Sequence, residues 1–201
     1  MEPQTVDLAH FSLHEREIQH ALGRVKVQDV DYADIYIEST VAESVSMEEG
    51  IVKRAVKSIS QGAGVRATAG EKTGFAFSDE LSKRDLEIAA DTARYIANSP
   101  QGDSPVPVTH RTQLSQNLYP VDRPNTEIAT QDRVDLLNMV DAEARMYDPR
   151  ISRVMASFNS EQKVIMVATT EGLLVGDIQP LSRLQVTCIA EDGTCLLYTS
   201  D

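Results

Sequence analysis

The feature that most constrains the fold of this sequence is that its strand-like segments come in runs and do not alternate with helices. Ile35 and Ile37 alternate with polar neighbours, and Val45 and Met47 do the same further on. A period of two residues is typical of a strand with one buried face. A second strand-rich run divides into four short segments, 151–160, 162–172, 173–183 and 184–193. Runs of strands favour an α+β fold with a largely antiparallel sheet over a doubly wound parallel fold.

Three segments show the helical repeat of apolar residues instead, namely Phe11–Lys26, Leu81–Ala97 and Thr130–Tyr147. Ser12 and Ser82 are expected to be the N-caps of the first two helices, because a serine hydroxyl can accept a hydrogen bond from an unpaired helical N–H. The sequence therefore predicts mostly antiparallel strand meanders with about three helices packed on the sheet.

Turn signals separate the expected strands, and they lie at Glu49-Gly50, 69–72, Glu171-Gly172 and Asp192-Gly193. Residues 98–126 are rich in Pro, Ser, Asn and Gly. This composition predicts a long crossing loop with at most one short extended piece.

The formal charge of −12 argues against a surface that binds nucleic acid. The basic cluster of the chain is short and consists of Lys53, Arg54 and Lys57.

No apolar run is long enough for a membrane helix, and the N-terminus does not resemble a signal peptide, so we expect a cytoplasmic protein without a membrane partner. Cys188 and Cys195 have neither the number nor the spacing of a disulfide framework or a zinc site.

The stretch Ser60–Gly74 nearly matches two phosphate-binding motifs. A P-loop is disfavoured because five residues separate Gly64 from Gly70, and because Glu71 would face the phosphates. Residues 62–67 fit the letters of a dinucleotide motif, but they are expected to continue as a strand and not to open the helix that would bind a pyrophosphate. We therefore expect these glycines to serve turns, a bulge or a close backbone approach.

The histidines near the N-terminus do not form a zincin motif. His14 and His20 are six residues apart and would diverge by about 120° around a helix. His10 and His14 could share an ion with Glu17, but His14 borders the apolar stripe, so packing or surface exposure is favoured. His110 has no visible partner in its loop.

Three segments resemble the N-terminal portion of the TldD/PmbA family of bacterial and archaeal metalloproteases. They are DYADIYIEST at 31–40, QGAGVRATAGEKTGFAFSDEL at 61–81 and ATTEGLLVGDIQPLSRLQV at 168–186. The resemblance runs from about Val6 to Gly193. Its most specific block, 61–81, is more similar to the TldD-type subunit than to its PmbA-type (TldE) partner.

This resemblance implies a zinc-dependent peptidase in which a TldD-type subunit pairs with a PmbA/TldE-like subunit as a heterodimer. The substrates it implies are peptides or unfolded proteins. In the family, two histidines of a His-Glu-x-x-x-His helix and a later cysteine hold the zinc, and the glutamate acts as general base on a zinc-bound water.

The sequence departs from the family at the zinc motif, because it contains no His-Glu-x-x-x-His. No catalytic, metal-binding or substrate-binding residue can therefore be assigned. Cys188 and Cys195 do not match the late cysteine of the family. We expect the full-length parent to be a zinc metallopeptidase, and this fragment alone to bind no zinc and to cleave no peptide.

The resemblance also predicts a domain organisation. Residues 1–193 would form the TldD/PmbA-like N-terminal domain, and the strand-rich part from about residue 150 would begin the next region of the family chain. The tail 194–201, TCLLYTSD, resembles translated adapter sequence and is expected to be non-native.

Three functional hypotheses follow from these patterns. In the first, the chain shapes the peptide cleft and the subunit interface of a TldD-type protease, and exposed strand edges capture extended peptides. In the second, it belongs to a non-catalytic PmbA/TldE-like subunit that binds substrate and assembles with the protease. The third, a nucleotide-binding module, is disfavoured by the motif failures at Ser60–Gly74.

Overall fold

The structure is a computed structural model that describes residues 6–26, 29–97, 107–110, 124–192 and 195–200. Its helices are η1 (Leu8–Phe11), α1 (Glu15–Val25), α2 (Lys83–Ile96), η2 (Asn125–Glu127) and α3 (Thr130–Tyr147), where η denotes a 3-10 helix. Its strands are β1 (Tyr32–Glu48), β2 (Ile51–Ala69), β3 (Lys72–Ser78), β4 (Thr109–His110), β5 (Ile151–Thr169), β6 (Leu173–Asp192) and β7 (Cys195–Ser200).

The described strands form one seven-stranded sheet in the order β3-β2-β1-β5-β6-β4, and β7 also pairs with β6. β3 runs antiparallel to β2, and β7 runs antiparallel to β6. The short strand β4 is parallel to β6 and is the extended piece expected within the loop. The predicted α+β class with a largely antiparallel sheet is therefore confirmed.

The strands are longer than the sequence predicted. β5 and β6 contain 19 and 20 residues, whereas the sequence suggested two short strands in each place. The polar Ser160 does not end β5, because its side chain is buried and within reach of Arg133. Pro180 does not end β6. On the side of β6 away from β5, the strands β4 and β7 pair only at residues 173–174 and 187–192 among the described residues, and a proline is tolerated on a strand edge without a partner.

The chain divides into two compact units that share the long strands. Unit 1 comprises residues 1–40, 60–120 and 163–179, and unit 2 comprises 41–59, 121–162 and 180–201.

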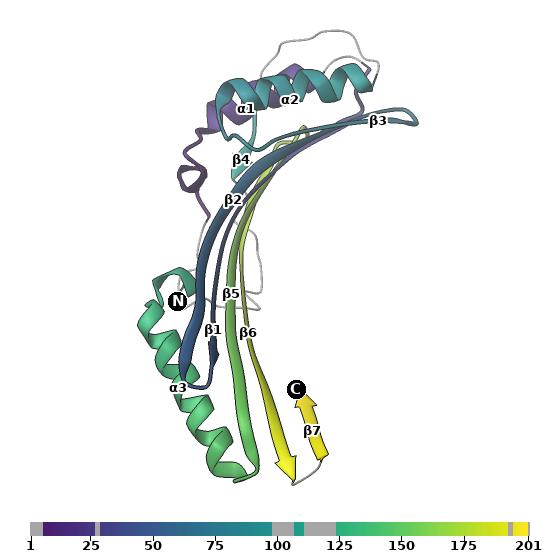
Figure 1. Ribbon diagram of the computed structural model, residues 1–201. Helices are drawn as coiled ribbons and strands as arrows, with labels where there is room; N and C mark the ends of the chain where they lie inside the picture. Colours follow the sequence, from purple (N-terminus) through teal and green to yellow (C-terminus); the bar gives the residue numbers. More distant parts are fainter. Residues whose placement is uncertain (1–5, 27–28, 98–106, 111–123, 193–194, 201) are drawn as a thin grey trace. The chain divides into compact units, whose positions relative to one another are not determined.

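In unit 1, α1 and α2 lie side by side on one face of the sheet (Figure 1). Alternate residues of the strands are buried beneath them, for example Ile35 and Ile37 in β1 and Val65 and Ala67 in β2. The other face of these strands carries the residues in between, and no helix of unit 1 covers it in the described residues. The alternation in the sequence therefore predicted the buried face correctly.

The start of the first helix was predicted incorrectly. Ser12 has a left-handed φ of 57° and ends η1, and α1 begins only at Glu15. Phe11 and Leu13 are both buried, and residues two apart cannot share one helical face, so the helix cannot begin there. At the observed start of α1, the backbone N–H of His14 donates a hydrogen bond to Glu17 Oε2 at 2.8 Å. Ser82 caps α2 as predicted, since its hydroxyl accepts from the Asp85 N–H at 3.2 Å.

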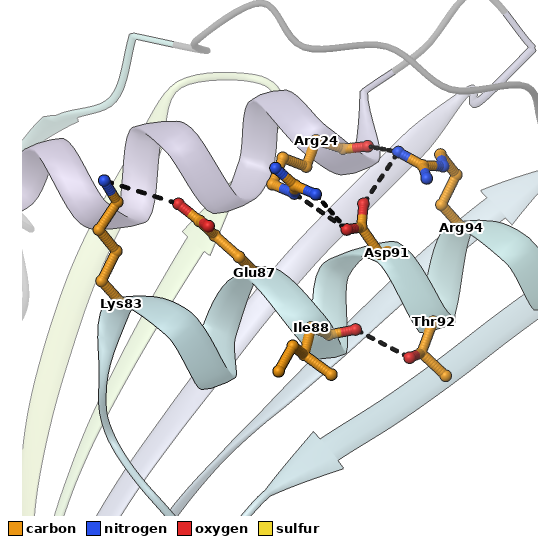
Figure 2. Close-up of polar contacts among 7 residues, drawn as sticks. All are labelled: Arg24, Lys83, Glu87, Ile88, Asp91, Thr92 and Arg94. Carbon is orange, nitrogen blue, oxygen red and sulfur yellow. Dashed lines mark hydrogen bonds and ion pairs between the residues drawn. The ribbon is translucent and has the colours of Figure 1, made fainter.

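One carboxylate joins the two helices of unit 1 (Figure 2). Asp91 of α2 accepts a hydrogen bond from Arg24 Nε of α1 at 3.1 Å and forms an ion pair with Arg94 Nη1, also at 3.1 Å. Arg94 Nη1 donates in addition to the backbone carbonyl of Arg24 at 2.7 Å. These charge-assisted contacts hold the last turn of α1 against α2.

In unit 2, α3 packs on the strands through a small core. The fully buried apolar residues of this core are Val45, Met47, Leu137 and Ala156. The helix begins and ends where the sequence predicted, at Thr130 and Tyr147.

The turn between β1 and β2 is built from two left-handed residues. Glu49 has φ 53° and Gly50 has φ 71°, the pair of values that suits a two-residue hairpin of type I′. Glutamate is strained in this conformation, whereas asparagine adopts it readily. We therefore expect Glu49→Asn to raise the free energy of unfolding by about 0.5–1 kcal/mol, measured by thermal denaturation.

The control for this prediction is Glu71→Asn, which removes the same charge from the β2–β3 turn at a residue without a positive φ. It should give no gain in stability. An equal gain in both variants would mean that loss of negative charge, and not relief of backbone strain, causes the effect.

An aromatic groove as candidate functional site

The stretch Ser60–Gly74 forms the end of β2, a turn and the start of β3. Ala69 pairs with Lys72 across the turn, and Gly70 in the turn has a left-handed φ of 58°. Residues 65–68 continue as strand, so no helix N-terminus is available there for a phosphate. The expected roles of these glycines in turns and close approaches are confirmed at Gly70 and Gly74, the latter lying against the α2 backbone.

A groove of about 390 Å³ opens in unit 1 above the middle of β2, at residues 60–64, on the sheet face that α1 and α2 do not cover. Its apolar walls are Phe75 and Phe77 of β3, which are 58% and 72% exposed, and Tyr36 of β1. The floor includes Gly62 and Gly64 of β2. Phe75 and Phe77 are two residues apart on one strand and therefore project to the same side.

The glycine floor allows an aromatic ring to lie on the sheet. A Cβ atom at Gly64 would lie 3.0 Å from the ring of Phe75, so the absence of a side chain leaves room for that ring. Exposed aromatic side chains that gather in one groove indicate a surface that binds another molecule. The groove can therefore hold an extended apolar or aromatic segment against the strands.

One end of the groove carries a hydrogen-bonded carboxylate. The Tyr36 hydroxyl donates to Glu38 Oε2 at 2.6 Å, and the Thr40 hydroxyl donates to Glu38 Oε1 at 3.0 Å. Lys163 Nζ lies 3.6 Å from Glu38 Oε2. The Tyr36 hydrogen bond is the main cause that lowers the pKa of Glu38. Burial, followed by the neighbouring Glu38, raises the pKa of Tyr36 to about 12.

These shifts keep Glu38 ionised and Tyr36 protonated at neutral pH. The raised pKa of Tyr36 means that its contribution to stability is complete below about pH 10 and is lost as the pH rises through about 12. We expect a phenol that titrates near pH 12 in the ultraviolet absorbance of the chain and that is missing in Tyr36→Phe. Tyr95→Phe, which removes a tyrosine outside the groove that is 80% exposed, should leave this late step in place. A step near pH 12 that persists in Tyr36→Phe would contradict the assignment.

Beside the groove, Arg66 pairs with a neighbouring carboxylate and lies over a tyrosine ring. Its Nε and Nη2 donate to Asp34 Oδ2 at 2.8 and 2.5 Å, and its guanidinium lies 6.0 Å from the centroid of the Tyr32 ring. The hydrogen bonds to Asp34 are the main cause that raises the pKa of Arg66. Arg66 is therefore a structural cation, whereas Lys72 lies exposed next to the turn.

The histidines singled out in the sequence do not share a helical face. His10 lies in η1, where its ring contacts the edge of Phe11, while His14 precedes α1 and His20 lies exposed within it. In the part of the chain that the structure describes, no three His, Cys, Asp or Glu side chains are placed to hold a metal ion. These residues do not fit the zinc that a metallopeptidase family implies.

The C-terminal features of the sequence lie in β6 and β7. Cys188 of β6 is a free, half-buried thiol. Asp192 pairs with Cys195 across the predicted hairpin, although Gly193 itself lies outside the described residues. Within the described ranges, no helix is both long and apolar enough to cross a bilayer.

Two consecutive sequence models of one family match the chain. PmbA/TldA metallopeptidase domain 1 matches residues 33–97, and the PmbA/TldA metallopeptidase central domain matches residues 123–200. The chain belongs to the PmbA/TldD family. The resemblance found in the sequence is thereby confirmed, and the groove residues of β1, β2 and β3 all lie within the match to domain 1.

Two relatives carry the description metalloprotease TldD homolog. The one from Haemophilus influenzae is 34% identical over 166 residues, which cover 83% of this chain and 34% of the relative. The one from Buchnera aphidicola subsp. Schizaphis graminum is 31% identical over 185 residues, which cover 92% of this chain and 38% of the relative. The chain thus spans little more than a third of the length of these PmbA/TldD family proteins.

Solved structures share the fold. TldE from Thermococcus kodakarensis superposes with a TM-score of 0.61 at 19% identity, over 85% of this chain and 39% of the other. A Thermotoga maritima protein superposes with a TM-score of 0.65 at 13% identity, over 84% of this chain and 38% of the other. At these identities the likeness concerns the fold alone.

The resemblance to the family did not predict the groove. Phe75 and Phe77 lie inside the most specific family block, but the sequence alone does not distinguish them from ordinary strand residues. A usable signal was present: glycine and alanine alternate with the two phenylalanines in β3, which places the small residues on one face and the large ones on the other.

Proposed function

We propose that this chain is the substrate-binding and subunit-assembly portion of a TldD-type zinc metallopeptidase, a cytoplasmic enzyme that acts on peptides or unfolded proteins. The similarity to two metalloprotease TldD homologues, across both family domains, supports this proposal. Zinc in the complete protein would activate a water molecule for attack on a peptide bond. The zinc ligands would come from residues other than those described here.

The exposed aromatic groove of unit 1 is the observation that carries the substrate part of the proposal. Unfolded chains differ in sequence, so a surface that accepts many of them must depend on apolar contact and on extended backbone. Phe75 and Phe77 supply apolar contact, and Gly64 leaves room for the Phe75 ring to lie on the sheet, where the ring can face a bound chain.

The groove can be tested with a permanently unfolded probe, reduced and carboxymethylated lysozyme carrying a fluorophore. We expect the 201-residue chain to bind this probe, and Phe75→Ser combined with Phe77→Ser to weaken binding about tenfold, because two exposed aromatic anchors are lost. Fluorescence anisotropy measures the change.

Tyr95→Ser is the matched control, since this aromatic residue is 80% exposed in α2 but does not line the groove. It should bind the probe as the unchanged chain does. Equal weakening by the control and by the Phe75 and Phe77 changes would indicate non-specific adhesion, and unchanged binding in the double variant would remove the groove from the proposal.

For assembly, we propose a heterodimer with a PmbA/TldE-like subunit. The shared fold with TldE supports this, because two subunits of similar fold can pack about an approximate two-fold axis. The alternative is that this chain itself belongs to the non-catalytic PmbA/TldE-like subunit. The complete reading frame decides between the two: a TldD-type protein must encode His-Glu-x-x-x-His and bind zinc, and a non-catalytic subunit must do neither.

A further inference from the structure

The outer edge of β2 has no partner over its first half. β2 has two neighbours in the described sheet, β1 on one side and β3 on the other. The pairing with β3 begins only at Ala63. Among the described residues, no strand therefore pairs with the outer side of β2 between Ile51 and Gly62. The side chains of Ile51–Gln61 are all exposed, without interruption.

Among the described residues, the protection of this edge against pairing comes from charge alone. A long edge with free N–H and C=O groups is a template for pairing with another chain, and proteins usually block it with a proline, a bulge, a covering segment or charged side chains such as lysine. The opposite edge of the sheet is blocked in this way, because β6 contains Pro180 and the Asn125 side chain donates to the Leu181 carbonyl at 3.3 Å. Residues 51–61 of β2 contain no proline and no glycine.

The charge of this segment is opposite to that of the whole chain. Residues 51–61 carry Lys53, Arg54 and Lys57 and no acidic residue, whereas the chain has a net charge of −12. Glu43 of β1 pairs with Lys57 at 2.8 Å, but Lys53 and Arg54 are exposed. Like charges would oppose each other if two copies of this edge paired, and an acidic strand would be attracted.

Space beside the strand can receive side chains of an added strand. A groove of about 420 Å³ in unit 2 lies between β2 and the segment that leads into α3. Ala55, Val56 and Lys57 line one wall, and residues 126–130 line the other. On β2 itself, Ile51 and Ile59 are 59% and 67% exposed, so apolar side chains of a neighbouring strand would find partners there.

We propose that the β2 edge, Ile51–Gln61, binds an acidic, extended segment of another polypeptide as an additional strand of the sheet. Main-chain hydrogen bonds along the free edge supply the affinity, and Lys53 and Arg54 select acidic side chains. This inference goes beyond the proposed function, because it concerns the unpaired edge of β2 and not the aromatic groove, and because it holds whether or not the complete protein is a peptidase.

The test uses a short fluorescein-labelled peptide that alternates Glu and Val, titrated with the 201-residue chain at low salt. We expect saturable binding by fluorescence anisotropy. Methylation of every second peptide nitrogen should weaken it about tenfold, because main-chain pairing is lost while the side chains stay the same. Lys53→Glu combined with Arg54→Glu should also weaken it about tenfold, because opposite charges become like charges.

Lys72→Glu combined with Arg84→Glu is the matched control, since it makes the same charge change at exposed residues away from this edge. It should leave the affinity unchanged, and a peptide with Lys in place of Glu should not bind. Equal binding of the methylated peptide would overturn the proposal in favour of simple charge attraction. If the chain does not bind the peptide but dimerises in sedimentation experiments, the edge pairs with a second copy of the chain. This outcome would also overturn the proposal.

Discussion

Arg133→Met is expected to lower the free energy of unfolding by about 3 kcal/mol or more, because it removes one partner of a buried ion pair. The Arg133 side chain is 2% exposed and pairs through Nη1 with Glu43, which is 12% exposed. Its Nη2 also donates to the Asn125 carbonyl at 2.8 Å. Without the guanidinium, Glu43 keeps only Lys57, at 2.8 Å, as a described ionic partner.

The loss should be large because unit 2 has little else to hold α3. Leu137 is the fully buried apolar residue that α3 contributes to the core of this unit, and Arg133 is the other buried residue of the helix. The ion pair is thus a main contact between helix and sheet. A helix that buries so few of its apolar side chains depends on such a contact to remain docked.

A second substitution distinguishes two causes of the lost stability. One is the loss of the attraction between Arg133 and Glu43, and the other is the cost of leaving the Glu43 carboxylate buried without its partner. Glu43→Met alone should also destabilise, but Arg133→Met combined with Glu43→Met should be more stable than either single variant, since two apolar side chains of similar volume can pack together. Arg145→Met is the control, because it breaks the more exposed pair with Asp141 on the same helix and should cost below about 1 kcal/mol.

Urea unfolding followed by circular dichroism measures these differences, and hydrogen exchange of the α3 amides assigns them to unit 2. If Arg133→Met matched Arg145→Met within error, the buried pair would be a consequence of helix docking and not its cause.

The periodicity of the sequence was sufficient to predict the fold class and the presence of the three α-helices, but not the start of α1. The α3 boundaries were found because Asp148-Pro149 stops the helix, and the buried face of β1 was found because Ile35 and Ile37 alternate with polar residues. Strand length was not predictable in the same way. Ser160 and Pro180 normally end strands, and only their positions in the sheet show why they do not do so here.

The candidate site was less predictable because strand alternation does not say which face is covered. In β3, the two phenylalanines alternate with Gly74 and Ala76, and the hydrophobic rule favours burial of the phenylalanines. The structure buries Gly74 instead and exposes Phe75 and Phe77. The small residues permit α2 to approach the strand, so the rings remain on the open face and line the groove.

Gly74→Ala is therefore expected to destabilise unit 1 by about 3 kcal/mol, a large effect for one methyl group. A Cβ atom at Gly74 would overlap the Ala93 carbonyl oxygen and lie 2.9 Å from the Ala97 nitrogen, both in the backbone at the end of α2. A helix backbone cannot turn aside as a side chain can, so α2 must move away from β3 or the strand must shift.

Gly64→Ala gives the matched comparison, because the added Cβ would lie 3.0 Å from the end of the Phe75 ring, which can rotate. We expect a cost below about 1 kcal/mol for this variant in urea unfolding. Similar stability of the two variants would mean that α2 docks loosely on β3. A large loss only at Gly74 would establish that the close approach of α2, made possible by a residue without a side chain, directs both phenylalanines to the open face of the sheet.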